Sequence, residues 1–192
     1  MNLLSIIIAS SNPKLAALTV SQAYKQAEGL PIEIICVAEG FTVKQLPKLQ
    51  CVRYVEKSLE GYAGAFAKDR GVSLATGEYV TFWDDDNFYY QNAISDILTS
   101  LLFKPMISIF KVEHLTPSQN YTIPRENPTN GFTMGDIDTM CFIVNKYLAN
   151  RVLWSEHKGK QTDFAWISKI NKLSQNVKFN NIVIGQKITT YG

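Results

Sequence analysis

The sequence has few cysteines, and their positions suggest neither a disulfide framework nor a metal centre. They are Cys36, Cys51 and Cys141, an odd number, and no two of them have the spacing of metal ligands. Each lies in an apolar, strand-like run, so we expect buried free thiols in a reducing compartment. The composition argues against a secreted, disulfide-stapled domain and favours a cytoplasmic protein.

Long apolar runs and blocks of one charge are also missing. No stretch approaches the roughly 20 apolar residues that cross a bilayer, so any membrane association, for example at the inner face of the membrane, would be peripheral. Residues 3–9 lack the basic region of a signal peptide and pass directly into a strand-to-helix pattern. The 19 basic and 17 acidic residues are scattered and give a net charge of +2, so no nucleic-acid partner is expected.

The chain contains no internal repeat, low-complexity tract or linker. Its 192 residues, 46% of them hydrophobic, can bury one sizeable core but are too few for two comfortable domains. Strand-like and helical patterns alternate, which predicts a single α/β domain with a mainly parallel, mixed sheet flanked by helices. Strands are expected at 3–9, 32–37, 51–55, 79–83, 106–112, 139–144 and 177–191, and helices at 13–29, 64–75, after Asn92 and after Asp163.

Residues 114–135 have a different character. They are rich in Pro, Asn, Thr and Gly and show no clear periodicity. We expect a long loop here, and long loops in compact domains are usually functional or disordered.

Three consecutive carboxylates follow the strand expected at 79–83. Asp84, Asp85 and Asp86 stand at its carboxyl end, where open α/β sheets bind ligands. If the backbone stays extended, Asp84 and Asp86 point to one side and Asp85 to the other. Clustered carboxylates repel each other unless a cation neutralises them, so Mn²⁺ or Mg²⁺ with phosphate oxygens would suit this cluster. The alternative is an acidic turn in which Asp84 only caps the next helix.

Residues 64–87 resemble the heart of the inverting family 2 glycosyltransferases. The segment reads Gly-Ala-Phe-Ala-Lys-Asp-Arg-Gly-Val-Ser-Leu-Ala-Thr-Gly-Glu-Tyr-Val-Thr-Phe-Trp-Asp-Asp-Asp-Asn. In that family a helix, an Ala-x-Gly-Glu-Tyr turn and a hydrophobic strand lead into an Asp-x-Asp signature. Residues 4–12 also look like the family's first strand and nucleotide loop. The resemblance implies a single nucleotide-diphospho-sugar transferase domain of the GT-A type, in which residues 1–90 bind the nucleotide-sugar and metal and residues 91–192 bind the acceptor.

The resemblance also implies roles for single residues of the donor half. Asp86 aligns with the family's metal ligand, and Asp84 is a second candidate for that role. Glu39 stands where the family has an Asp that contacts uracil, although its position alone would suggest a solvated strand-end carboxylate. Lys68 and Arg70 could meet the diphosphate or be solvated helix charges. The candidates for nucleotide-sugar binding are Ala9, Ser10, Ser11, Glu39, Lys68, Arg70, Asp84 and Asp85.

In the acceptor half, residues 135–144 and 162–166 are similar to the family's later segments. Asp163 matches the base that takes the acceptor's proton, while the alternative is a helix N-cap. Trp154 and Asp138 are weaker candidates for acceptor binding, since a single Trp is more often structural. A lone exposed histidine such as His157 usually neither titrates usefully nor binds metal.

The expected activity is therefore transfer of a sugar from a nucleotide-sugar, with uracil the implied base, to a hydroxyl group of a carbohydrate or glycolipid, as in polysaccharide biosynthesis. The family implies inversion at the anomeric carbon. Two alternatives stay open. A Mg²⁺-dependent phosphoryl or nucleotidyl transferase also uses strand-end Asp clusters, but no phosphate-loop glycine motif is visible. A non-catalytic nucleotide- or carbohydrate-binding protein of the same fold would explain the altered turn at Ala38 and Glu39, whereas Asp86 and Asp163 together argue against it.

Overall fold

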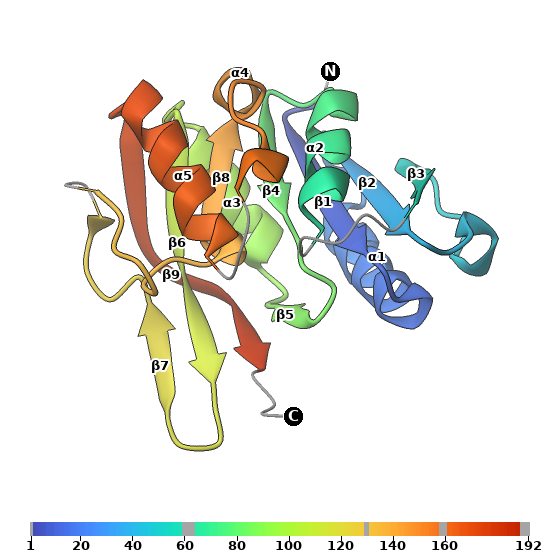
Figure 1. Cartoon of the computed structure of the whole chain (residues 1–192), viewed down its shortest axis with the longest axis horizontal. Coiled ribbons are helices and arrows are strands. Elements are labelled where there is room, and N and C mark those ends of the chain that lie inside the picture. Colours follow the sequence, from blue (N-terminus) through green and yellow to red (C-terminus); the bar gives the residue numbers. More distant parts are fainter. Residues whose placement is uncertain (1, 59–63, 129–130, 158–160, 189–192) are drawn as a thin grey trace.

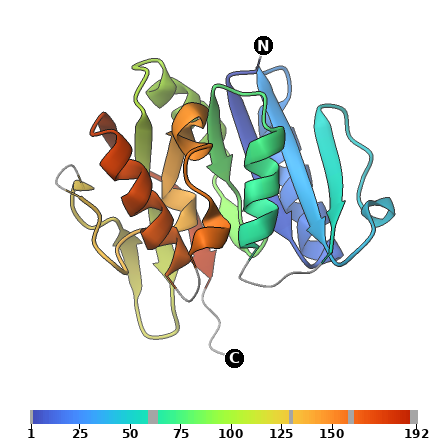
Figure 2. The same ribbon diagram turned by 45° about the horizontal axis from the view of Figure 1, so that its top comes forward.

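The computed structural model describes residues 2–58, 64–128, 131–157 and 161–188, and there it shows a nine-stranded sheet with helices on both faces (Figure 1). The strand order is β3-β2-β1-β4-β8-β6-β9-β5, with β7 paired to β6. Helices α1 and α3 cover one face, and α2, α4 and α5 cover the other (Figures 1 and 2). The expected α/β fold with a mixed sheet is confirmed.

The first half of the chain builds a parallel sheet. Its elements are β1 (Leu4–Ser10), α1 (Pro13–Ala27), β2 (Ile32–Glu39), the short helix η1 (Val43–Gln45), β3 (Val52–Lys57), α2 (Ala65–Leu74) and β4 (Tyr79–Phe82). Strand β1 pairs in parallel with both β2 and β4, and all three are almost wholly buried, as continuous apolar runs predict. The carboxyl ends of these three strands therefore meet at one edge of the sheet.

The second half adds antiparallel pairs. Its elements are β5 (Asn87–Tyr89), α3 (Ala93–Leu101), β6 (Ile107–Leu115), β7 (Asn120–Ile123), η3 (Thr139–Cys141), β8 (Phe142–Asn145), α4 (Lys146–Ala149), η4 (Trp154–Glu156), α5 (Thr162–Leu173) and β9 (Val177–Ile188). Strand β8 lies antiparallel between β4 and β6, while β9 runs parallel to β6 and antiparallel to β5. The C-terminal strand thus reaches the segment that follows the carboxylate cluster.

Four aromatic rings join the two halves beneath α5. Trp154 and Trp166 stack with centroids 4.5 Å apart, and Phe82 meets both rings edge-on. Phe142 stacks on Trp166 at 5.6 Å. Because β4, β8, η4 and α5 each contribute one ring, this cluster holds α5 against the end of β4. Among the described residues, no helix has both the length and the apolar character to cross a membrane.

Two sequence-based expectations are wrong in part. The loop expected at 114–135 begins as a hairpin, because β6 continues to Leu115 and pairs with β7 from Asn120 to Ile123. Residues 129–130 of that segment lie outside the described residues. All three cysteines are free and Cys36 and Cys141 are buried as expected, but Cys51 is exposed. It precedes β3 in a left-handed conformation (φ 55°), so it stands in a turn rather than in the strand.

Candidate active site

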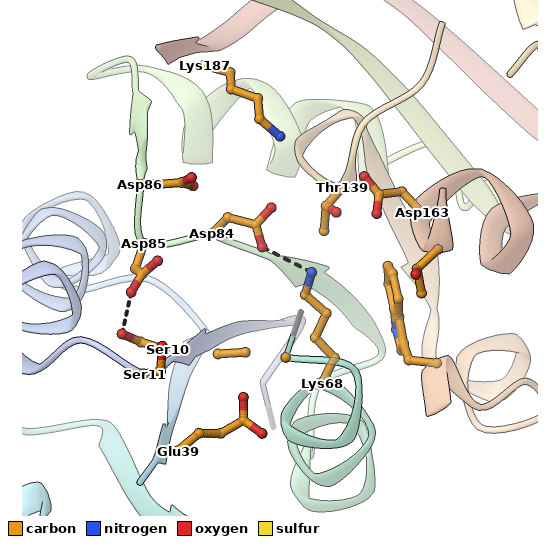
Figure 3. Close-up of a pocket in the computed structure, with 14 residues that line it drawn as sticks. Ser10, Ser11, Glu39, Lys68, Asp84, Asp85, Asp86, Thr139, Asp163 and Lys187 are labelled. Carbon is orange, nitrogen blue, oxygen red and sulfur yellow. Dashed lines mark hydrogen bonds and ion pairs between the residues drawn. The ribbon is translucent and has the colours of Figure 1, made fainter. Parts of the chain in front are cut away.

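The carboxyl ends of β1, β2 and β4 open into a cavity of about 400 Å³ (Figure 3). Its walls come from segments throughout the chain. The lining residues are Ala9, Ser10, Ser11, Glu39, Gly64, Lys68, Asp84, Asp85, Asp86, Thr139, Trp154, Thr162, Asp163 and Lys187. Five of them are carboxylic acids and two are lysines, so the cavity carries an excess of negative charge.

The three consecutive aspartates have three different environments. Asp84 Oδ1 lies 3.0 Å from Lys68 Nζ, and Asp85 accepts a hydrogen bond from the Ser10 hydroxyl. Asp86 is exposed. Asp84 and Asp86 point into the cavity, whereas Asp85 points toward Ser10, which is the alternation expected from the sequence (Figure 3). Asp84 caps no helix, because a turn at Asp85 and Asp86 leads from it into β5, so the acidic-turn alternative is right about the turn and wrong about the cap.

The electrostatics of the cluster favour a cation. Burial raises the pKa of Asp85, and the cavity walls around Asp86, although its side chain is exposed, desolvate it in part and raise its pKa as well. The neighbouring aspartates raise both pKa values further, while Ser10 lowers that of Asp85 and Lys187 lowers that of Asp86. A positive ion beside them would relieve this repulsion. The carboxylate oxygens of Asp86 and Asp84 are hard donors of the kind that Mg²⁺ and Mn²⁺ prefer, so these residues fit such an ion. In the described part of the chain no group of three or more His, Cys, Asp or Glu could hold a metal alone, so phosphate oxygens and water would have to complete its shell.

Lys68 forms part of the cavity floor. It is buried, and its ammonium group lies 4.8 Å from the centroid of the Trp154 ring as well as against Asp84. Burial alone would lower the pKa of Lys68, but Asp84 and Asp163 outweigh it and raise the pKa, so the side chain stays charged. A solvated helix charge is therefore the wrong interpretation of Lys68. The interpretation as a solvated helix charge does fit Arg70, which is exposed and does not line the cavity.

Glu39 and Gly64 shape the end of the cavity that lies away from Lys187 (Figure 3). Glu39 ends β2 and is only 3% exposed, so the interpretation as a solvated carboxylate is wrong. Gly64 precedes α2 with φ 73°, and a Cβ atom there would lie 3.3 Å from Ala9 Cβ and 3.7 Å from Glu39 Oε2. Both the left-handed backbone and the tight packing favour glycine. Gly64 thus lets α2 begin directly against the ends of β1 and β2.

Asp163 lies on the wall opposite the aspartate cluster (Figure 3). It is the second residue of α5, whose N-cap is Gln161, so the N-cap interpretation of Asp163 is wrong. Burial raises the pKa of Asp163; Lys68 lowers it, and Asp138 and Asp84 raise it, with a net increase. A carboxylate with a raised pKa that faces a cavity is suited to accept a proton.

The two weaker acceptor candidates, Trp154 and Asp138, contribute to the local structure through packing and hydrogen bonds that involve backbone N–H groups. Trp154 is 1% exposed and packs in the aromatic cluster, while its backbone N–H and that of Ser155 donate to Asp69 at 2.7 and 3.1 Å. Asp138 is buried, lies outside the cavity lining and accepts from the Met140 N–H at 3.1 Å. Trp154 lines the cavity although its ring is buried in the aromatic cluster, so its assignment stays a prediction. Asp138 does not line the cavity and is not placed to bind an acceptor, so that assignment is corrected. His157 likewise does not line the cavity, and burial lowers its pKa.

Thr139, Thr162 and Lys187 line the cavity but were missed in the sequence. Lys187 lies in β9, opposite Asn87 of β5, and this pairing brings it beside Asp86. No local signal could have identified Lys187, because its segment reads only as β-prone and its position depends on a long-range strand pair.

A family model described as glycosyl transferase family 2 matches residues 5–169. No curated protein gives a significant match. The fold resembles S. aureus TarS 1–349 in complex with UDP-GlcNAc, with a TM-score of 0.74 at 13% identity over 100% of this chain and 60% of that one. The same fragment in complex with UDP gives a TM-score of 0.70 at 12% identity, over 98% of this chain and 61% of that one.

A longer form of TarS gives a TM-score of 0.72 at 13% identity, over 97% of this chain. The chain spans only 37% of that longer form and about 60% of the 1–349 fragment. These matches confirm the expected GT-A type of fold.

Proposed function

The chain belongs to glycosyl transferase family 2, and we propose that it transfers a sugar from a UDP-sugar to a hydroxyl group of a carbohydrate or glycolipid, with inversion of the anomeric carbon. One observation carries this proposal. Asp163, a carboxylate with a raised pKa, faces the aspartate cluster across a single cavity (Figure 3). Transfer needs a base on one side of the anomeric carbon and a site for the leaving diphosphate on the other.

The nucleoside would lie at the end of the cavity formed by Ala9, Ser11 and Glu39. Glu39 can accept a hydrogen bond from an N–H group of the base, and uracil has such a group at N3. The UDP and UDP-GlcNAc complexes of the structurally similar TarS support a uridine nucleotide here. Asp85 and Ser10, which hydrogen-bond each other, form the adjoining wall.

Asp86, with Asp84 as the second candidate, would hold a divalent cation, Mn²⁺ or Mg²⁺, together with the donor's phosphates. When bound, such an ion supplies Lewis-acid stabilisation of the negative charge on the departing diphosphate. The Lys68 ammonium group, whose Nζ lies 3.0 Å from Asp84 Oδ1, holds the Asp84 carboxylate in place.

Asp163 would take the proton from the acceptor hydroxyl as that oxygen attacks the anomeric carbon. The bond between the anomeric carbon and the diphosphate oxygen breaks, and its electron pair stays on the phosphate. Because the base and the diphosphate site lie on opposite walls, attack comes from the face opposite the leaving group. The products are an inverted glycoside and UDP, and the proton remains on Asp163 until solvent removes it.

A panel of UDP-sugars with Mn²⁺ and a crude acceptor extract tests this function. We expect UDP release from at least one donor, and NMR of the purified product should show an anomeric configuration opposite to that of the donor. Release of sugar 1-phosphate instead of UDP would mark cleavage between the two phosphates and would favour the phosphoryl or nucleotidyl transferase. Binding of UDP-sugars without any turnover would favour a non-catalytic binding protein.

A further inference from the structure

The C-terminal strand brings a second lysine into the cavity. Lys187 of β9 lies opposite Asn87 of β5, and its side chain, 31% exposed, lines the cavity next to Asp86. In Figure 3 it points toward the space between Asp86 and Thr139, at the end of the cavity opposite Glu39. Lys187 therefore stands far from the proposed nucleoside end and near the wall that carries Asp163.

A buried carboxylate holds this lysine in place. Asp138 Oδ2 accepts a hydrogen bond from Lys187 Nζ at 2.9 Å, and the Asp138 side chain is 6% exposed. Burial opposes charge on both groups, yet their attraction outweighs it, so the pKa of Asp138 is lowered and that of Lys187 is raised. The pair is therefore ionised. The other Asp138 oxygen accepts from the Met140 N–H at 3.1 Å, which fixes the carboxylate and hence the lysine.

The geometry of the pair leaves Lys187 able to bind a ligand. An ammonium group donates three hydrogen bonds, and Asp138 accepts one of those from Lys187. The two lysines of the lining differ in this respect. Lys68 is buried beneath Asp84 and only 7% of its side chain is exposed, whereas the tip of Lys187 reaches into the cavity (Figure 3).

We propose that Lys187 binds the distal phosphate of the donor, the phosphate whose oxygen leaves the sugar, and that Asp138 is the positioning residue for this contact. The inference rests on the proposed function and assigns a direction to the donor. With the base of the nucleotide at Glu39, the phosphate attached to the sugar lies toward Lys187 and Asp163. As the bond to the anomeric carbon breaks, its electron pair moves onto an oxygen of that phosphate, and the ammonium group stabilises the added charge.

Binding of UDP and UMP in the presence of Mn²⁺ tests the inference, because only UDP has the distal phosphate. Isothermal titration calorimetry would compare the wild type with Lys187→Met and with Lys172→Met, which removes an exposed charge from α5 outside the cavity. We expect Lys187→Met to weaken UDP binding by roughly 10- to 100-fold, the value of a charge-assisted hydrogen bond, and to leave UMP binding unchanged. Lys172→Met should change neither affinity. Inorganic pyrophosphate, a diphosphate without a nucleobase, allows the same comparison of the wild type with the two variants.

A second variant keeps the test valid if Lys187→Met folds poorly. Removing Lys187 alone leaves the buried Asp138 charge without its partner, which is destabilising. In the double variant Asp138→Asn/Lys187→Met both charges are removed, and the Asn oxygen can still accept from Met140. This variant should fold and show the same selective loss of UDP affinity. Lys187→Arg keeps the charge and the ion pair, so it should retain part of the UDP affinity that Lys187→Met loses.

The failure of this inference can be distinguished from failure of the proposed function. Unchanged UDP affinity in a folded variant without Lys187 would overturn the inference and leave the proposed transfer standing. Equal losses of UDP and UMP affinity would also overturn it, because they would place the effect away from the distal phosphate. A wild-type protein that binds neither nucleotide nor any UDP-sugar would contradict the proposed function itself.

Discussion

The ammonium group of Lys68 lies 3.0 Å from the carboxylate of Asp84 and joins the first turn of α2 to the end of β4. Both residues belong to the segment that resembles family 2 enzymes, and the contact holds the helix of that segment against the aspartate cluster. The pair is largely shielded from water, with side chains 7% and 23% exposed. It keeps the Asp84 carboxylate turned into the cavity (Figure 3).

Replacing Lys68 should therefore reduce stability. Lys68→Met leaves Asp84 partly buried without its partner, and we expect the free energy of unfolding to fall by about 3 kcal/mol. Arg70→Met, two residues further along the same helix and exposed, should change it by less than about 0.5 kcal/mol. Urea denaturation of the two variants measures the difference. Equal stabilities would show that the pair contributes little.

Nucleotide binding should depend on a divalent cation. Without one, the aspartate cluster faces the donor's phosphates with like charge, so UDP affinity should fall sharply in excess chelator. Asp86→Asn should behave as the wild type does under chelation. Calorimetry with and without Mn²⁺ measures this, and equal affinities would remove the role proposed for Asp86.

The cation affinity should also depend on pH in a defined direction. Cation binding needs an ionised Asp86, and partial desolvation in the cavity together with the charge of Asp84 raises the pKa of Asp86 above the ordinary value of 3.8. Protonation therefore begins at a higher pH than for a free aspartate, and Mn²⁺ affinity should decline well before pH 3.8 is reached. A titration followed by Mn²⁺ electron paramagnetic resonance would measure it. A decline confined to the ordinary carboxyl range would contradict the expectation.

The turn that leads into β4 depends on a buried carboxylate, Glu33. Its Oε1 accepts from the Ser5 hydroxyl at 2.6 Å, from the Thr76 hydroxyl at 2.8 Å and from the Gly77 N–H at 3.1 Å. Burial raises the pKa of Glu33, but these bonds and one from the Thr76 N–H outweigh it and lower the pKa below 4.5. The ionised form is thus favoured in the folded state.

Because the folded-state pKa is lowered, Glu33 contributes stability above pH 4.5, and this contribution is lost as the pH falls through the folded value. Glu33→Gln should be about 1–3 kcal/mol less stable than the wild type at neutral pH. The difference should shrink in acid. Glu28→Gln, an exposed change at the end of α1, is the control. A difference that stays constant with pH would mean that the charge of Glu33 is not responsible.

The parts of the fold that could be predicted are those set by local sequence. The apolar runs of β1, β2 and β4 identify buried parallel strands, and Asn12 with Pro13 indicates the start of α1, where the Asn12 side chain accepts from the N–H groups of Lys14 and Leu15. Because the carboxyl ends of parallel strands share one edge, the aspartate cluster and Glu39 could also be expected to lie near each other.

The rest depends on pairings that no local pattern reveals. The position of Lys187 depends on the pairing of β9 with β5. The insertion of β8 between β4 and β6 brings η3 and its N-cap residue Asp138 to the place where Asp138 accepts a hydrogen bond from Lys187. Trp154 could not be identified as a core residue without its partner Trp166. The division into donor and acceptor halves stays a prediction, and Lys187 shows that the C-terminal strand contributes to the wall beside Asp86.

Turnover of Asp163→Asn is the most direct test of the central claim. Asn cannot take a proton at neutral pH, and other carboxylates nearby cannot easily replace it, since Glu156 is paired with Lys169 and Asp136 with Arg125 outside the cavity. The assay measures UDP release from a UDP-sugar in the presence of acceptor. We expect the variant to keep its melting temperature and UDP affinity while the rate falls by roughly 10² to 10⁴. A folded Asp163→Asn protein that turns over at nearly the wild-type rate would contradict the proposed mechanism.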